Sequence, residues 1–168
     1  MSLFPVEIEQ QAAHIVALYK EQQLMLSTAE SCTGGLIAGA LTEISGSSAV
    51  VDRGFVTYTN DAKMELLGVA QATLLEFGAV SKETALQMAC GALIRSRADV
   101  SVAVTGIAGP TGGTDEKPVG LVHLALQTRA GTVHHRKMHY RAIGRSRIRL
   151  ATVQTALEML QEAVQAAS

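Results

Sequence analysis

Apolar and polar residues alternate along the chain with two distinct periods. Apolar side chains recur at helical spacing in the first segment, from about Pro5 to Gln22, and in the last, from about Gly144 to Ala166. Between them, short apolar or β-branched runs bounded by turn-forming residues indicate strands at 24–28, 54–59, 99–106, 119–128 and 132–140. Shorter helices are predicted from near Cys32 to residue 44, over 61–68, and from a cap at Ser81 to about Arg97.

This order of elements predicts the fold class. Helices between buried strands cover both faces of a sheet, and the turn Arg129-Ala130-Gly131 indicates a hairpin, which requires at least one antiparallel strand pair. We therefore expect a three-layer α/β/α sandwich with a mixed sheet. No repeat or low-complexity segment interrupts the pattern, so residues 1–168 are predicted to form a single domain. Ligands in such folds collect at the carboxyl ends of strands, where the predicted loops at Ser31, 60–63 and after Thr105 compete for them.

Composition narrows the classes of function. The chain has 168 residues, of which 48% are apolar and 17% charged, and this suits a domain with a substantial core. Its 14 basic and 15 acidic residues provide no overall attraction to nucleic acid or to an anionic membrane. Only Cys32 and Cys90 occur, so neither a disulfide framework nor a CxxC metal pair is expected. With no leader-like N-terminus and no apolar run near ~20 residues, we expect a soluble, unprocessed, cytoplasmic chain.

The stretch 28-TAESCTGG-35 places Ser31 where a predicted strand ends and a helix begins. A hydroxyl at a strand end is exposed, and the first N–H groups of a helix point toward any negative charge formed beside it. This is the outline of an oxyanion hole. The alternative is that Ser31 or Thr33 only caps the helix. Cys32 is a rival nucleophile, although a packing role is favoured because no histidine partner is evident.

Lys63 is the candidate base for this hydroxyl. Asn60 is predicted to cap the helix 61–68, which places Lys63 in its first turn. Burial and the helix dipole both favour a neutral amine there, and lowering the pKa from ~10.4 to ~7.5 costs about 4 kcal/mol of differential solvation. The site must therefore be enclosed. A solvated surface lysine is the alternative.

The histidines provide neither a base nor a metal site in this interpretation. His134, His135 and His139 are clustered in sequence. On a strand, however, His135 and His139 would lie ~13 Å apart, which is too far for both to bind one ion. A solvated or half-buried strand face explains the cluster better, and no metal is predicted.

The loop 105-TGIAGPTGG-113 can present backbone amides to an anion, most naturally a phosphate. No GK[ST] closes it, so it is not a Walker loop, and a plain connecting turn is the alternative. Arg145, Arg147 and Arg149 follow at the start of the last helix and can hold a phosphate, although such clusters are often simply solvated.

Several of these motifs together resemble the CinA C-terminal domain family. The segments that carry the resemblance, in this order and spacing, are 28-TAESCTGG-35, 46-GSS-48, 54-GFVTYTNDAK-63, 78-GAVS-81, 105-TGIAGPTGG-113 and 117-KPVG-120. The resemblance covers about residues 6–165, taken as the domain core, and we expect the nucleotidyl N-terminal domain of longer members to be missing.

Stand-alone members of this family are nicotinamide mononucleotide deamidases. The resemblance implies hydrolysis of a carboxamide to a carboxylate and ammonia by a serine-lysine dyad, in recycling of pyridine nucleotides, with no metal or organic cofactor. A small nucleotide substrate and a homo-oligomer, most simply a dimer, are the expected partners. Two alternatives stay open: a nucleotide-binding regulator without turnover, and an amidase for a different metabolite.

The resemblance also implies roles for single residues. Ser31 matches the nucleophile and Lys63 the base, with Tyr58 and Asn60 in the same pocket. Ser48 is a candidate proton relay, or only part of a loop. Two further sets of expected site residues are the oxyanion-loop residues Cys32, Thr33, Gly34 and Gly35, and the nucleotide-loop residues Thr105, Gly106, Gly109, Gly112 and Gly113.

Three charged residues have less certain roles in this pattern. Glu30 orients Lys63 or a substrate hydroxyl, or it anchors a helix N-terminus. Arg145 is one candidate for the phosphate, although family members usually carry an acidic residue in the stretch that is shortened here to Gly144-Arg145. Arg149 is the other candidate.

Overall fold

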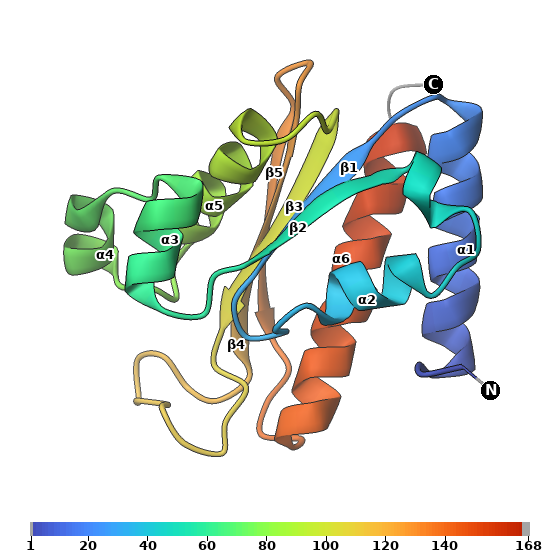
Figure 1. Ribbon diagram of the computed structural model, residues 1–168. Coiled ribbons are helices and arrows are strands. Elements are labelled where there is room, and N and C mark those ends of the chain that lie inside the picture. The colour runs from blue at the N-terminus through green and yellow to red at the C-terminus, as the bar shows by residue number, and fades with distance from the viewer. Residues whose placement is uncertain (1, 166–168) are drawn as a thin grey trace.

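A mixed sheet forms the centre of the molecule (Figure 1). The computed structural model describes residues 2–165, and within them five strands are ordered β2-β1-β3-β4-β5. Their bounds are β1 Leu26–Glu30, β2 Val51–Val56, β3 Val100–Gly106, β4 Leu121–Thr128 and β5 Val133–His139. β1 is parallel to both β2 and β3, whereas β4 is antiparallel to β3 and β5. The predicted mixed sheet with a β4–β5 hairpin is confirmed.

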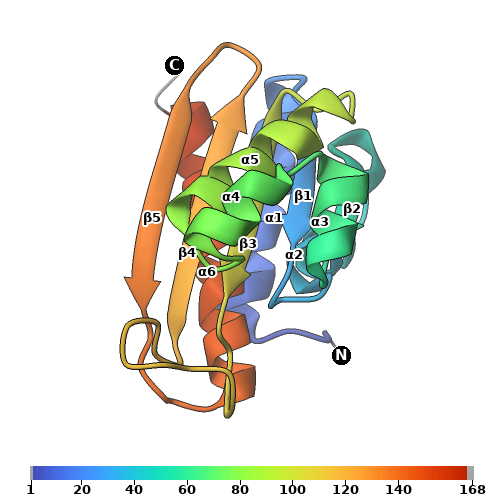
Figure 2. The ribbon, with the colours of Figure 1, turned by 90° about the vertical axis from the view of Figure 1, so that its left-hand side faces the viewer.

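Helices cover both faces of this sheet, which confirms the predicted three-layer sandwich. α1, α2 and α6 pack on one face, while α3, α4 and α5 lie on the other (Figures 1 and 2). The helices are α1 Val6–Glu21, α2 Leu36–Thr42, α3 Asn60–Leu67, α4 Gln71–Phe77, α5 Lys82–Ile94 and α6 Arg145–Gln165, with a short 3-10 turn at Ser47–Ala49. Within residues 2–165, no helix has the length and apolar character needed to cross a membrane.

The two faces of the sheet carry side chains of different size. On β3, Val102 and Val104 belong to the large cluster beneath α1 and α6, whereas Ala103 belongs to a smaller cluster beneath α5. Small residues on the second face let α5 approach closely, and the Ser101 hydroxyl donates a hydrogen bond to the Ala89 carbonyl at 2.7 Å. Successive strand residues point to opposite faces of the sheet, so this alternation also decides which side chains at the strand ends reach the site.

Several element boundaries differ from the predictions. α2 begins at Leu36 rather than near Cys32, because residues 31–35 form turns in which Gly34 and Gly35 have φ of 59° and 98°. Thr59, not Asn60, caps α3, since its side chain accepts a hydrogen bond from the Ala62 N–H. α4 was not predicted, and α5 ends at Ile94 rather than near Arg97. The Ser81 cap of α5 is confirmed. The predicted end of the last helix, Ala166, lies outside the described residues.

Gly91 sets how closely α5 packs against α3. A Cβ atom built on Gly91 would overlap the backbone of Leu67, including its carbonyl oxygen. Leu67 is the last residue of α3, the same short helix that carries Lys63. The missing side chain at Gly91 therefore helps to place the lysine.

We predict that Gly91→Ala lowers the free energy of unfolding by about 1–3 kcal/mol, because α3 must shift to make room for the methyl group. Urea titration monitored by circular dichroism measures this change. Gly39→Ala in α2 is the matched control, because its new methyl group would meet the Phe4 ring at an ordinary 3.5 Å. That variant should be neutral or gain up to about 1 kcal/mol from helix propensity. Equal stabilities of the two variants would contradict this account of the helix contact.

Candidate active site

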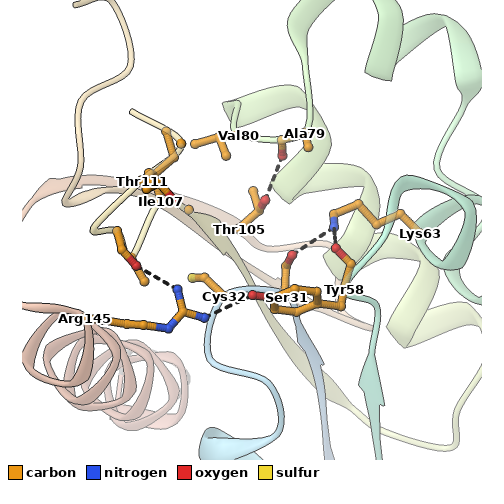
Figure 3. A pocket seen from close by; sticks show the side chains of 14 residues that line it. Ser31, Cys32, Tyr58, Lys63, Ala79, Val80, Thr105, Ile107, Thr111 and Arg145 are labelled. Carbon is orange, nitrogen blue, oxygen red and sulfur yellow. Dashed lines mark hydrogen bonds between the residues drawn. The ribbon is translucent and has the colours of Figure 1, made fainter. Parts of the chain in front are cut away.

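The carboxyl ends of three parallel strands meet at one pocket, so the three loops that were predicted to compete for a ligand lie together. Ser31 follows β1, Tyr58 follows β2, and the glycine-rich loop follows β3, while the loop before α5 closes one wall (Figure 3). The cavity has a volume of about 340 Å³. Its lining residues are Ser31, Cys32, Tyr58, Lys63, Ala79, Val80, Thr105, Gly106, Ile107, Ala108, Gly109, Thr111, Gly112 and Arg145.

The Lys63 ammonium contacts the Ser31 hydroxyl inside this pocket. Its Nζ atom donates to Ser31 Oγ at 2.9 Å, to the Thr57 carbonyl at 2.8 Å and, more weakly, to the Tyr58 carbonyl at 3.5 Å. Lys63 is 1% exposed and Ser31 is 8% exposed. No carboxylate appears among the hydrogen-bond partners described for Lys63. The alternative interpretation, in which Lys63 is a solvated surface lysine, is therefore excluded.

Burial changes the acidity of Lys63. Removal of the amine from water lowers the pKa of Lys63 from 10.5 to about 8, and the smaller electrostatic effect of nearby Cys32 acts in the opposite direction. A neutral amine has two N–H bonds and one lone pair. With both N–H bonds directed at the Thr57 and Tyr58 carbonyls, the lone pair is left for the Ser31 hydroxyl proton. The contacts of Lys63 thus match those of a general base.

Alternation along β1 separates Ser31 from Glu30. Ala29 faces α5, so Ser31, two residues later, points to the side of the sheet that carries α3 and Lys63. Glu30 points to the opposite side, where its carboxylate accepts hydrogen bonds from the Thr33 hydroxyl and from the N–H groups of Gly35, Ile37 and Ala38. Of the roles predicted for Glu30, the structure favours the anchor of a helix N-terminus.

This arrangement corrects the predicted oxyanion hole at the start of α2. Glu30 already occupies the N–H groups of Gly35, Ile37 and Ala38, and the Gly34 N–H donates to the Ser31 carbonyl at 3.1 Å. Neither Ser31 nor Thr33 caps α2. Of the four residues predicted to form the oxyanion loop, only Cys32 lines the pocket.

The glycine-rich loop after β3 presents backbone amides to the other side of the pocket. Among the described residues, no hydrogen-bond acceptor is found for the N–H groups of Ala108, Gly109, Thr111 and Gly112. Thr105 lines the pocket, but its hydroxyl donates to the Ala79 carbonyl at 2.7 Å and so ties the loop before α5 to the sheet. Gly113 does not line the pocket and lies against the backbone of Val119. Successive amides of this kind suit an anion.

Arg145, the first residue of α6, spans the mouth of the pocket (Figure 3). One terminal nitrogen donates to the Gly109 carbonyl at 2.9 Å, and the other donates to the Tyr58 hydroxyl at 3.1 Å. Tyr58 is 59% exposed. Arg145 lines the pocket, and no aspartate or glutamate is among the described residues that line it, so the cavity is positively charged even when Lys63 is neutral.

Other predicted site residues lie away from the cavity. Ser48 is exposed in the turn before β2, level with the start of β1, so it is at the opposite end of the sheet from Ser31 and does not relay protons to the dyad within this chain. Asn60 is exposed and does not line the pocket. Arg149 contacts the Ser31 loop from α6 instead of facing the cavity.

Sequence reasoning missed part of the pocket. The wall residues Ala79, Val80, Ile107 and Ala108 are apolar, and no chemical signature marks them in the sequence. Thr57 contributes only its carbonyl, which any residue could supply. The segment 78-GAVS-81, which carries part of the family resemblance, was the available indication that Ala79 and Val80 belong to the site.

Two histidines meet on the α5 face of the sheet, but they form no metal centre. His123 Nδ1 and His135 Nε2 lie 3.0 Å apart, with the rings stacked. No group of three or more histidine, cysteine, aspartate or glutamate side chains within residues 2–165 could hold a metal ion. Neither histidine lines the pocket.

Residues 8–164 match the CinA C-terminal domain. The chain belongs to this family. A CinA-like protein of Syntrophus aciditrophicus is 48% identical over 99% of this chain, but the match covers 39% of its own length. The chain thus spans about two fifths of that curated relative. The nicotinamide-nucleotide amidohydrolase PncC of Enterobacter agglomerans is 48% identical, and the match covers 87% of this chain and 91% of its own.

Solved structures support the same assignment to the CinA C-terminal domain family. The crystal structure of the competence/damage inducible protein CihA from Agrobacterium tumefaciens superposes with a TM-score of 0.96 at 68% sequence identity. The superposition covers 98% of this chain and 99% of that chain. The family fold therefore extends over nearly the whole sequence.

The lowered pKa of Lys63 predicts a pH-dependent penalty in stability. Between pH about 8 and 10.5 the folded chain binds fewer protons than the unfolded chain, so its stability should rise with pH relative to Lys63→Met, which cannot titrate. The penalty is fully present below pH about 8 and amounts to about 3 kcal/mol, since one pKa unit corresponds to about 1.4 kcal/mol.

Urea unfolding of both proteins at several pH values across this window measures the effect. Lys20→Met, at an exposed position of α1, is the control and should not change the pH dependence. A constant difference between native protein and Lys63→Met would show that Lys63 remains charged in the fold.

Proposed function

We propose that this chain is a nicotinamide-nucleotide amidase, which hydrolyses the carboxamide of nicotinamide mononucleotide to a carboxylate and ammonia. The observation that carries the proposal is the buried Lys63 amine, 2.9 Å from the Ser31 hydroxyl, at the base of a positively charged pocket. The similarity to the PncC amidohydrolase over most of both chains supports the choice of reaction. The reaction belongs to recycling of pyridine nucleotides, for which we propose a cytoplasmic location. The predicted homo-oligomer stays a prediction.

The first step is attack by Ser31 on the carboxamide carbon. Neutral Lys63 accepts the hydroxyl proton as the C–O bond forms, and the carbonyl oxygen becomes an oxyanion. The N–H of the residue after a nucleophile is a common oxyanion donor. Here that residue is Cys32, which lines the pocket, whereas the amides at the start of α2 are occupied by Glu30.

The second step expels ammonia and then releases the product. Protonated Lys63 returns its proton to the departing nitrogen, and the C–N bond breaks to leave an acyl group on Ser31. Lys63, neutral again, accepts a proton from water, which attacks the acyl carbon. The tetrahedral species collapses to the carboxylic acid as Lys63 returns its proton to Ser31, and the acid loses its own proton to solvent to become the carboxylate. One side chain thus serves as base and acid in both halves.

The phosphate end of the substrate fits the opposite side of the pocket. Amides of Ala108, Gly109, Thr111 and Gly112 and the Arg145 guanidinium are suited to hold it, because hydrogen bonds to a charged group are about twice as strong as neutral ones. No acidic residue lines the cavity among the described residues, so nothing there repels the anion. Binding at this end can position the carboxamide for attack.

The nucleophile can be tested by two neighbouring substitutions. Ser31→Ala should lower ammonia release from nicotinamide mononucleotide by about a thousandfold or more, while substrate affinity and melting temperature barely change. Cys32→Ala should keep most of the native rate, because burial raises the pKa of the Cys32 thiol to about 11 and keeps it protonated. The reverse pattern would make the thiol the nucleophile. Binding without ammonia release by the native chain would favour a regulatory module.

The phosphate assignment predicts that nicotinamide riboside is a poor substrate. The native chain should hydrolyse it with a kcat/KM roughly a hundredfold below that for the mononucleotide, which corresponds to about 3 kcal/mol. Arg145→Ala should lose much of the activity toward the mononucleotide and little toward the riboside. Arg147→Ala, an exposed arginine two residues away, is the control for net charge. Equal turnover of both substrates by the native chain would contradict the phosphate site.

A further inference from the structure

Arg149 holds the backbone of the loop that carries Ser31. Its Nε atom donates to the Cys32 carbonyl at 3.1 Å, and a terminal nitrogen donates to the Thr33 carbonyl at 3.0 Å. We propose that Arg149 is a positioning residue for the hydrolysis: it sets the orientation of Ser31 and of the Cys32 N–H and does not bind the substrate phosphate. This inference rests on the proposed amidase function.

The glycine at position 34 lies next to Arg149 in this loop. Gly34 has φ of 59°, and a Cβ built there would lie 3.4 Å from a terminal nitrogen of Arg149. In the turn that contains this positive φ, the Cys32 and Thr33 carbonyls accept hydrogen bonds from Arg149 of α6. Since Arg149 lies one helical turn after Arg145, both arginines project from the start of α6, but only Arg145 lines the pocket.

The loop is held from two directions by opposite charges. The Glu30 carboxylate accepts hydrogen bonds from the N–H groups of Gly35, Ile37 and Ala38. On the other side, Arg149 donates hydrogen bonds to the Cys32 and Thr33 carbonyls. Hydrogen bonds that involve a charged group are stronger than neutral ones, so each side is a firm anchor. Residues 31–35 have no regular helix to hold them. Without Arg149, the Cys32 and Thr33 carbonyls would lose the hydrogen bonds that they accept from the guanidinium.

The effect reaches the reacting atoms through a short chain of contacts. Arg149 fixes the peptide units on either side of Thr33 and thereby the position of Gly34, whose N–H donates to the Ser31 carbonyl at 3.1 Å. Because a peptide unit is planar and trans, the direction of the Ser31 carbonyl also fixes the direction of the Cys32 N–H. That N–H is the proposed oxyanion donor. A small rotation of the loop would therefore misalign nucleophile and donor together.

A phosphate role for Arg149 conflicts with these contacts. The side chain is half-buried, it does not line the cavity, and two of its three nitrogens are engaged by the loop. To reach a ligand, it would have to release both carbonyls next to the nucleophile. Arg145 has no such commitment to the Ser31 loop, since its partners are Gly109 and Tyr58.

The test is a kinetic comparison of Arg149→Ala, Arg149→Lys and the control Arg147→Ala. Arg149→Ala should lower kcat by roughly tenfold to a hundredfold with KM nearly unchanged, because small misplacements of reacting groups cost that much. The loss should be the same fold for the mononucleotide and for the riboside. Arg149→Lys should recover part of the rate, since an ammonium can reach one carbonyl but lacks the guanidinium fork. Arg147→Ala should be close to native.

A second measurement does not depend on the natural substrate. The rate at which a sulfonyl fluoride modifies Ser31, followed by intact-mass spectrometry with Ser31→Ala as blank, should fall in Arg149→Ala and stay native in Arg147→Ala. If the native chain releases no ammonia from the mononucleotide, the proposed substrate is wrong, but this labelling rate still tests Arg149.

Three outcomes would overturn the positioning role. A rise in KM confined to the mononucleotide would assign Arg149 to the phosphate instead. Native kcat and native labelling in Arg149→Ala would show that the loop does not need the guanidinium. Loss of the folded state, by circular dichroism and thermal melting, in both Arg149 variants would make Arg149 a residue of the fold alone.

Discussion

The burial of one amine is the feature on which the candidate site depends. Lys63 is enclosed at the start of α3, and its Nζ contacts the Ser31 hydroxyl and two backbone carbonyls instead of water. Enclosure lowers its pKa to about 8, which makes a lysine usable as a base near neutral pH. The surrounding structure maintains this enclosure: Gly91 admits α3 against α5, and small residues on the sheet admit α5.

On the Ser31 side of the candidate site, an irregular loop has to be held in place. Residues 31–35 are neither strand nor helix, so hydrogen bonds from Glu30 and Arg149 replace the regular backbone pattern. The carboxylate of Glu30, a strand residue, accepts hydrogen bonds from the first N–H groups of α2. In most helices, the side chain of the residue just before the helix does this. Ser31, the neighbour of Glu30, faces the other side of the sheet. Because side chains alternate along β1, Glu30 supports the loop on one side of the sheet, while Ser31 lines the pocket on the other.

Much of the fold could be predicted because its signals are local. Apolar periodicity, the Ser81 cap and the turn around Gly131 depend on residues close together in sequence, and they led to the mixed sheet and the three layers. Boundaries were less predictable. The glycines at 34 and 35 were interpreted as the start of a helix, but positive φ at both positions delays that helix to Leu36. α4 was not predicted, because no side chain caps its start in the way that Ser81 marks the start of α5.

The sequence by itself determined which chemical groups are present and near which strand ends they lie, because strand positions and side-chain alternation follow from short-range patterns, whereas the strand order β2-β1-β3-β4-β5 does not. It thereby pointed to Ser31, Lys63 and the glycine-rich loop. Only the tertiary structure decided what each charged group contacts. It placed Glu30 on the amides of α2, Arg149 on the Ser31 loop and Arg145 at the mouth of the pocket, and it placed Ser48 at the far end of the sheet. The reason is physical: hydrogen bonds of long side chains depend on the packing of helices that are distant in sequence, and no local pattern records that packing.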